Sequence, residues 1–185
     1  MVLTAEDPVT WKPRRIAVAG TTGSGKTTLA TRLSHEFDLP YVEIDSLYHG
    51  PGWEPRPTFV SDVEQFIAGD SWVIEWQYRA VRGQILARAD TLLWLDLPTP
   101  VSMRQLTHRT LRRRFARVEL WNGNIEPPLR TIFTDPDHIL RWGFRTRNKL
   151  RDAIPALAPH LPHLHIVRFT RHRDVEAWLG RVGPT

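Results

Sequence analysis

Short apolar runs and segments with helical spacing alternate along the chain. Residues 15–19, Arg-Ile-Ala-Val-Ala, form an apolar run that ends at a glycine, and this pattern predicts a buried strand. From residue 25 to residue 37, apolar side chains recur every three or four positions, which predicts an amphipathic helix. The first structured unit is therefore a strand, a glycine-rich loop and a helix.

The same pattern continues to the end of the sequence. Apolar runs predict further strands at residues 39–44, 71–76, 91–98 and 163–169, and helical spacing predicts helices at residues 59–67, 80–89 and 174–182. Residues 45–57 hold prolines and glycines that forbid regular structure, in a loop long enough to be functional. Alternating strands and helices indicate an α/β fold with a mostly parallel sheet covered on both faces.

Composition narrows the class of protein. A chain of 185 residues with 41% hydrophobic content forms one well-buried core, so we expect a single domain over residues 1–185. There is no cysteine, which excludes disulfides, thiolate catalysis and cysteine-type zinc sites. Without an apolar run of membrane-spanning length or a signal-peptide pattern, we expect a soluble cytoplasmic protein with no membrane partner.

The strongest motif is the sequence GTTGSGKT at residues 20–27. It fits the phosphate-loop pattern G-x-x-x-x-G-K-T and lies between a predicted strand and a predicted helix, as that pattern requires. Backbone amides in such a loop surround phosphate oxygens, Lys26 reaches the β- and γ-phosphates from the solvent-facing loop mouth, and the Thr27 hydroxyl ligates Mg²⁺. The alternative is a chance glycine-rich turn. The expected ATP-binding residues here are Gly20, Thr21, Thr22, Gly23, Ser24, Gly25, Lys26, Thr27 and Thr28.

Three carboxylates follow predicted strands, where open parallel sheets bind ligands. Asp45 is a candidate for binding the acceptor or accepting its proton, with a helix or turn cap as the alternative. Glu75 is a candidate for binding Mg²⁺ or its waters, with a plain strand-end carboxylate as the alternative. Asp96 precedes Pro98, where an aspartate is more often a helix cap.

Positive charge is concentrated in residues 101–151, which hold twelve Lys and Arg against four Asp and Glu. An apolar stripe that includes Leu106 and Phe115 predicts a helix here, with Arg109, Arg112 and Arg113 pointing away from it. These arginines fit a polyphosphate, a nucleic-acid backbone or a solvated face. Residues 121–124 are interpreted as a turn in which the asparagines serve only as turn-forming residues.

A second basic helix is predicted over residues 138–154. It places Arg141, Arg145, Asn148 and Asp152 on one face, which we expect to close over the same site.

The order of these parts resembles the small phosphate-loop kinases related to adenylate and shikimate kinases, and most closely the family known as DNA topology modulation proteins. The resemblance runs from GTTGSGKTTLA through EIDSLYHGPGW, DSWVIEWQY, ADTLLWLDLP and RTLRRRF to ELWNGN. It implies a three-layer P-loop NTPase fold with a five-stranded parallel sheet and an arginine-rich helical lid within about residues 101–151. It also implies a lid formed by Arg109 to Arg117, and a candidate adenine-side loop from Thr170 to Arg173.

This chain departs from the family pattern in two places. Residues 75–78, Glu-Trp-Gln-Tyr, stand where the family has Asp-Gly-Asn-Tyr. The GFPR signature of adenylate kinases is absent, which argues against a nucleoside monophosphate as the acceptor.

Two functions from different classes fit these observations. The favoured one is a kinase that uses ATP and Mg²⁺, with Lys26, Asp45, Arg109 and Arg113 in catalysis and a small-molecule acceptor bound near Asp45, Tyr48, Arg79 and Arg82. The alternative is an ATP-dependent protein that binds nucleic acid through residues 101–151, although no recognised nucleic-acid motif supports it. The sequence leaves the acceptor and the oligomeric state open.

Overall fold

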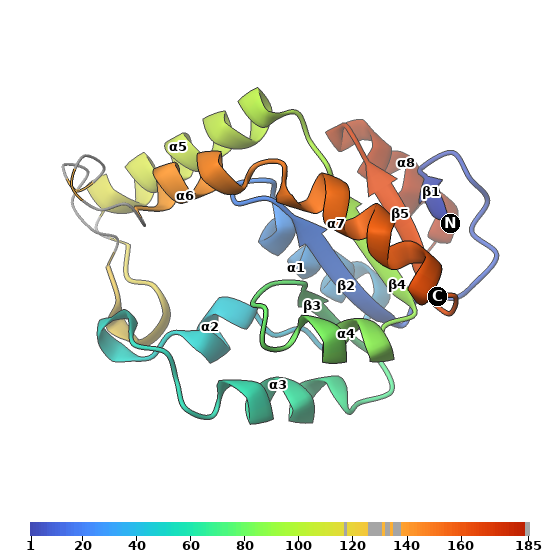
Figure 1. Ribbon diagram of the computed structural model, residues 1–185, viewed down its shortest axis with the longest axis horizontal. Coiled ribbons are helices and arrows are strands. Elements are labelled where there is room, and N and C mark those ends of the chain that lie inside the picture. The colour runs from blue at the N-terminus through green and yellow to red at the C-terminus, as the bar shows by residue number, and fades with distance from the viewer. Residues whose placement is uncertain (117, 126–130, 132–133, 135–137, 184–185) are drawn as a thin grey trace.

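The chain forms a five-stranded parallel sheet with helices on both faces (Figure 1). The computed structural model describes residues 1–116, 118–125, 131, 134 and 138–183. The strand order is β1-β5-β4-β2-β3, with β1 (Val2–Thr4), β2 (Arg15–Gly20), β3 (Trp72–Glu75), β4 (Thr91–Leu95) and β5 (His165–Phe169). The α-helices are α1 (Lys26–Phe37), α2 (Ile44–Tyr48), α3 (Phe59–Ile67), α4 (Arg82–Arg88), α5 (Thr99–Phe115), α6 (Ile139–Thr146), α7 (Lys149–Leu157) and α8 (His172–Val182).

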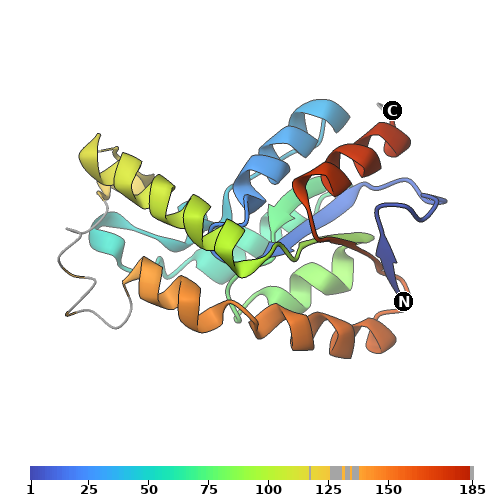
Figure 2. The same cartoon turned by 90° about the horizontal axis from the view of Figure 1, so that it is seen from above.

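Strand β2 shows how the three layers are built. Its alternate side chains point to opposite faces of the sheet. Ile16 and Val18 pack in the core that includes α1 and α8, whereas Ala17 and Ala19 pack in the core that includes α3, α4 and α7. The two groups of helices lie on opposite sides of the sheet in Figure 2. The expected three-layer α/β fold is confirmed.

One predicted strand is wrong. Residues 39–44 do not join the sheet as a strand: Tyr41 makes an isolated bridge to Val73, and α2 begins at Ile44. After this bridge, the backbone amide of Ile44 donates to the Glu75 carboxylate at 3.0 Å and not to a neighbouring strand. The fifth strand is β1, a short segment that pairs with β5 and that the sequence analysis did not predict.

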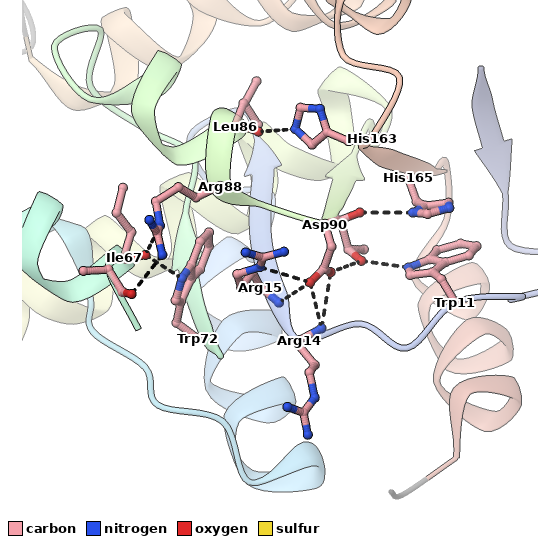
Figure 3. Close-up of polar contacts among 12 residues, drawn as sticks. Trp11, Arg14, Arg15, Ile67, Trp72, Leu86, Arg88, Asp90, His163 and His165 are labelled. Carbon is pink, nitrogen blue, oxygen red and sulfur yellow. Dashed lines mark hydrogen bonds and ion pairs between the residues drawn. The ribbon is translucent and has the colours of Figure 1, made fainter. Parts of the chain in front are cut away.

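The amino ends of the strands are closed by the N-terminal arm (Figure 3). The Asp90 carboxylate accepts a hydrogen bond from the backbone amide of Arg15 at 2.8 Å. The Trp11 indole donates to the Thr91 hydroxyl at 2.8 Å, and its ring stacks on His165 at 4.0 Å. This edge is therefore filled by structural contacts, and the opposite edge carries the phosphate loop.

Helices α5 and α6 contact each other at the other end of the molecule (Figure 1). A β-carbon at Gly143 of α6 would lie 2.6 Å from the Cδ2 atom of Leu106 of α5, so a larger residue here would require the Leu106 side chain to shift. The predicted basic helix over residues 138–154 is wrong as a single element, because it breaks between α6 and α7. The predicted apolar stripe also fails at Phe115, which is 77% exposed.

Candidate active site

The phosphate loop joins the end of β2 to the start of α1. Gly23 and Gly25 have φ angles of 82° and 92°, a left-handed conformation that favours glycine. At Gly23 a β-carbon would also lie 2.5 Å from the carbonyl oxygen of Ser102, and at Gly20 it would lie 2.3 Å from the Ser24 hydroxyl. The first amides of α1 have no partner within the helix, so the residues present fit a bound phosphate chain.

Lys26 is half-buried at the start of α1, and not solvent-facing as expected. Its ammonium group donates to the carbonyl oxygen of Thr21 at 3.2 Å. Burial lowers the Lys26 pKa from 10.5 to about 8; the carboxylates of Asp45 and Glu75 oppose this shift, whereas Arg109 adds to it. A half-buried cation that has lost part of its hydration is suited to bind an anion that replaces that hydration.

A cleft of about 1080 Å³ opens over the phosphate loop. Its walls include every predicted loop residue from Gly20 to Thr28, together with the predicted Asp45, Tyr48, Arg79, Arg82, Arg109 and Arg113. The tertiary structure therefore brings the predicted phosphate and acceptor residues to one space, large enough for more than one small ligand.

Asp45 lies in the first turn of α2 and faces this cleft. Its Oδ1 atom accepts hydrogen bonds from the Gln77 side-chain amide and the Tyr78 hydroxyl, both at 2.6 Å. No residue that the structure describes donates to its Oδ2 atom. Asp45 does not cap a helix, because Glu43 is the N-cap of α2.

Glu75 ends β3 and is 2% exposed. One carboxylate oxygen accepts from the Tyr41 hydroxyl at 2.8 Å, and the other accepts from the Ile44 amide at 3.0 Å. These bonds hold the segment that leads into α2 and Asp45. No group of three or more His, Cys, Asp or Glu within the described residues is arranged to hold a metal ion.

The other predicted acceptor residues, Tyr48, Arg79 and Arg82, line the same cleft as Asp45. Tyr48 stacks on Tyr78 with 4.0 Å between ring centroids. Arg82 places its guanidinium group 4.8 Å from the centre of the Trp76 ring, and burial lowers its pKa. The side-chain Nε of Arg82 is buried without a hydrogen-bond partner among the described residues, and Arg79 is exposed at the cleft edge.

The arginines of α5 divide between two faces. Arg109 and Arg113 line the cleft, on the side of the helix that carries the buried Leu106 and Thr110. Arg112 is exposed and does not line the cleft, as expected. The prediction that all three arginines point away from the buried stripe is therefore wrong for Arg109 and Arg113. Arg117 lies outside the described residues.

Two other predicted contributions to the cleft differ in the structure. Within the predicted adenine-side loop, Thr170 is exposed and bonds to Asp174, whereas His172 at the start of α8 lines the cleft. From α6, Trp142 and Thr146 line the cleft, whereas Arg141 and Arg145 do not. The four predicted residues, Arg141, Arg145, Asn148 and Asp152, therefore do not close over the site as a group.

Asp96 is a structural anchor. It is 8% exposed and pairs with Arg151 of α7 at 2.8 Å and with Arg168 of β5. It is not a helix cap, since Pro98 precedes α5 in that position.

Sequence analysis missed a clasp between residues 49–53 and residues 121–124. The Asn124 side-chain amide donates to the Gly50 carbonyl at 2.8 Å, and its oxygen accepts from the Trp53 amide at 3.0 Å. The Trp121 indole donates to Glu43 at 2.8 Å, while burial raises the Glu43 pKa. Asn124 is 4% exposed, so the interpretation of these asparagines as simple turn formers is wrong. The polar-aromatic sequence Trp-Asn-Gly-Asn was the available signal.

Two known structures with a similar fold are a gluconokinase and a shikimate kinase. A gluconokinase from Sinorhizobium meliloti 1021 aligns with 92% of this chain and 91% of its own, at 18% identity and a TM-score of 0.52. A shikimate kinase from Acinetobacter baumannii in complex with shikimate aligns with 88% of this chain and 87% of its own, at 17% identity and a TM-score of 0.51.

No protein-family model matches the chain, and no curated protein matches its sequence. The structural likeness therefore shows a fold shared with this gluconokinase and this shikimate kinase, and the resemblance to DNA topology modulation proteins stays an expectation. No helix among the described residues is long and apolar enough to cross a membrane.

Proposed function

We propose that the protein is a kinase that transfers the γ-phosphoryl group of ATP to a hydroxyl group of a small acceptor. The observation that carries the proposal is the shared cleft, in which the phosphate loop, Arg109, Arg113 and the Asp45 carboxylate face one space. The likeness in fold to a gluconokinase and a shikimate kinase supports it.

The phosphate end of the cleft supplies charge neutralisation. Loop amides and Lys26 would hold the β- and γ-phosphates, while Arg109 and Arg113 would meet charge that develops during transfer. Thr27 would hold Mg²⁺, which neutralises phosphate charge when bound. Both oxygens of Glu75 already accept hydrogen bonds, so Glu75 would contact the ion through its waters.

The end of the cleft that would hold the small acceptor supplies a carboxylate that can take up a proton. The acceptor oxygen forms a bond to the γ-phosphorus as the bond from that phosphorus to the β-bridging oxygen breaks, and the hydroxyl proton passes to Asp45. ADP and the phosphorylated acceptor leave. Arg79 and Arg82 favour an acceptor that carries a negative charge, because the half-buried Arg82 guanidinium lacks full hydration.

The test measures ADP formation from Mg²⁺·ATP with a panel of hydroxyl compounds that includes D-gluconate, shikimate, sugars and nucleosides. We expect acceptor-dependent turnover that Asp45→Asn lowers by about 100- to 10,000-fold, with ATP affinity by calorimetry nearly unchanged. Lys26→Ala should lower ATP affinity about 10- to 100-fold, and Lys12→Ala, which removes an exposed lysine of the N-terminal arm, should not. A wild-type protein that neither binds ATP nor forms ADP contradicts the proposal.

A further inference from the structure

The two oxygens of the Asp45 carboxylate have different surroundings. Oδ1 accepts two hydrogen bonds at 2.6 Å, from the Gln77 amide and from the Tyr78 hydroxyl. Oδ2 accepts none from the residues that the structure describes. A carboxylate held by two bonds at one oxygen cannot rotate without losing both, so Oδ2 is the oxygen that remains for the acceptor.

The Tyr78 hydroxyl has a second neighbour, and counting protons determines the direction of each bond. Its oxygen lies 3.2 Å from His49 Nε2. A phenol hydroxyl has one proton to donate, and it donates to the carboxylate of Asp45 because an anionic acceptor forms the stronger hydrogen bond. His49 must then donate from Nε2 to the Tyr78 oxygen. His49 Nδ1 is buried without a hydrogen-bond partner in the described part of the chain, which is consistent with a neutral ring that has its proton on Nε2.

The backbone at Tyr78 supports a placed side chain. Tyr78 has a φ angle of 54°, a left-handed conformation that is strained for a bulky residue. Its ring is held by stacking on Tyr48 at 4.0 Å and by an edge contact with Phe59 at 5.2 Å. Packing therefore stabilises a strained turn that points the hydroxyl at Asp45.

We propose that Tyr78 and His49 are positioning residues that fix the Asp45 carboxylate, so that Oδ2 faces the acceptor hydroxyl. The chain of donors runs from His49 Nε2 to the Tyr78 oxygen and from the Tyr78 hydroxyl to Asp45 Oδ1. This inference rests on the proposed kinase function for the role of Asp45, whereas the donor chain itself is a property of the folded protein.

Nuclear magnetic resonance tests the donor chain without any substrate. Long-range ¹H–¹⁵N spectra at pH 8 report which ring nitrogen of His49 carries the proton. We expect the Nε2–H form in the wild type and in Tyr48→Phe, and a mixture of both forms in Tyr78→Phe, which removes the acceptor of that proton. A wild-type ring with its proton on Nδ1 overturns the proposal.

Kinetics test the positioning role. Slow hydrolysis of Mg²⁺·ATP, with water in place of the acceptor hydroxyl, serves as the probe. We expect Tyr78→Phe and His49→Leu each to lower kcat at least about tenfold with the KM for ATP within about twofold of wild type. His49→Gln keeps an N–H near the Nε2 position and should retain most of the activity. The double variant Tyr78→Phe/His49→Leu should lose little more than either single variant, because both break one chain.

Two results separate the inference from the kinase function. Wild-type kcat in Tyr78→Phe, or a loss confined to KM, overturns the positioning role even if the protein is a kinase. A wild type that neither binds ATP nor forms ADP with any compound of the acceptor panel defeats the kinase function, and the His49 spectrum then still decides whether the donor chain exists. His160→Asn, an exposed histidine outside the cleft, is the matched control and should match wild type in both measurements.

Discussion

Lys26 carries a charge that the free protein holds only at a cost. Burial brings its pKa to about 8, below the 10.5 of an ordinary lysine, although Asp45 and Glu75 favour the charged form. Phosphate groups bound beside the ammonium would favour the charged form further and raise its pKa. ATP binding and protonation of Lys26 are therefore expected to be linked.

The first prediction follows from this linkage. At pH 9 most of the free protein has a neutral Lys26, so ATP binding should take up protons; at pH 7 the lysine is already charged and uptake should be small. Calorimetry in buffers with different ionisation enthalpies measures the protons taken up. Lys26→Arg keeps its charge at both pH values and should show no uptake. Equal proton uptake at pH 7 and pH 9 in the wild type would contradict the link.

Glu75 shows how one residue determines the position of another. Its buried carboxylate holds Tyr41 and the amide of Ile44, and Asp45 is the next residue along the chain. The end of β3 therefore positions the start of α2. Its contribution to Mg²⁺ binding stays a prediction beside this structural role.

At the scale of elements, the clasp joins the segment after α5 to the segment after α2. The Asn124 side chain makes hydrogen bonds to Gly50 and Trp53. The aromatic rings of Trp53 and of His49 each contact the ring of Trp121. Trp53, His49 and Trp121 all line the cleft. The clasp thus connects the helix that carries Arg109 and Arg113 to the wall around the acceptor residues.

Removing the clasp should loosen this wall. Asn124→Ala leaves the half-buried amide of Trp53 and the buried carbonyl of Gly50 without their side-chain partner, so we expect a loss of about 1–3 kcal/mol in local stability. Hydrogen exchange of the Trp53 amide should speed up in proportion. Asn148→Ala, which removes one exposed hydrogen bond to Arg151, is the control. Unchanged exchange at Trp53 would show that the clasp contributes nothing to the stability of this wall.

At the scale of the whole molecule, the two faces of α5 separate the kinase and nucleic-acid hypotheses. Arg109 and Arg113 face the cleft, while Arg104, His108 and Arg112 are exposed at intervals of four residues on the outer side. The inner pair is placed to meet phosphates of a nucleotide, and the outer stripe is open to an anionic polymer.

The last prediction compares the two faces. Arg109→Ala/Arg113→Ala should lower ATP turnover more than ATP affinity, because these charges act mainly during transfer, whereas Arg104→Ala/Arg112→Ala should leave turnover unchanged. Both variants are also titrated with duplex DNA across a salt series. Tight wild-type binding at physiological salt that the outer variant weakens, with a salt slope reduced by about one unit per arginine, would favour the nucleic-acid hypothesis. We expect no such binding.

The sequence by itself determined the local parts of this protein. Apolar alternation and glycine placement predicted β2, the phosphate loop and α1, because the chemistry of a phosphate loop lies within eight consecutive residues. Helical spacing also predicted α3 and α8, since each buries one regular face. Asp45 was found through a predicted strand over residues 39–44 that does not form, yet the segment still ends beside Glu75 at the carboxyl end of β3, because the Glu75 carboxylate accepts from the Ile44 amide.

Only the tertiary structure decided how distant segments meet. Residues 39–44 have strand-like composition, yet the Glu75 carboxylate accepts a hydrogen bond from the Ile44 amide and α2 begins at Ile44. Which arginines of α5 face the cleft became clear only from the tertiary structure, in which the contact with Gly143 shows which side of the helix is buried. Asn124 and Gly50 are 74 residues apart, and so are invisible to local patterns. Hydrogen bonds and packing between such segments form only when the whole chain has folded. The phosphate loop could therefore be predicted from the sequence, whereas the contacts that build the wall around the acceptor residues could not.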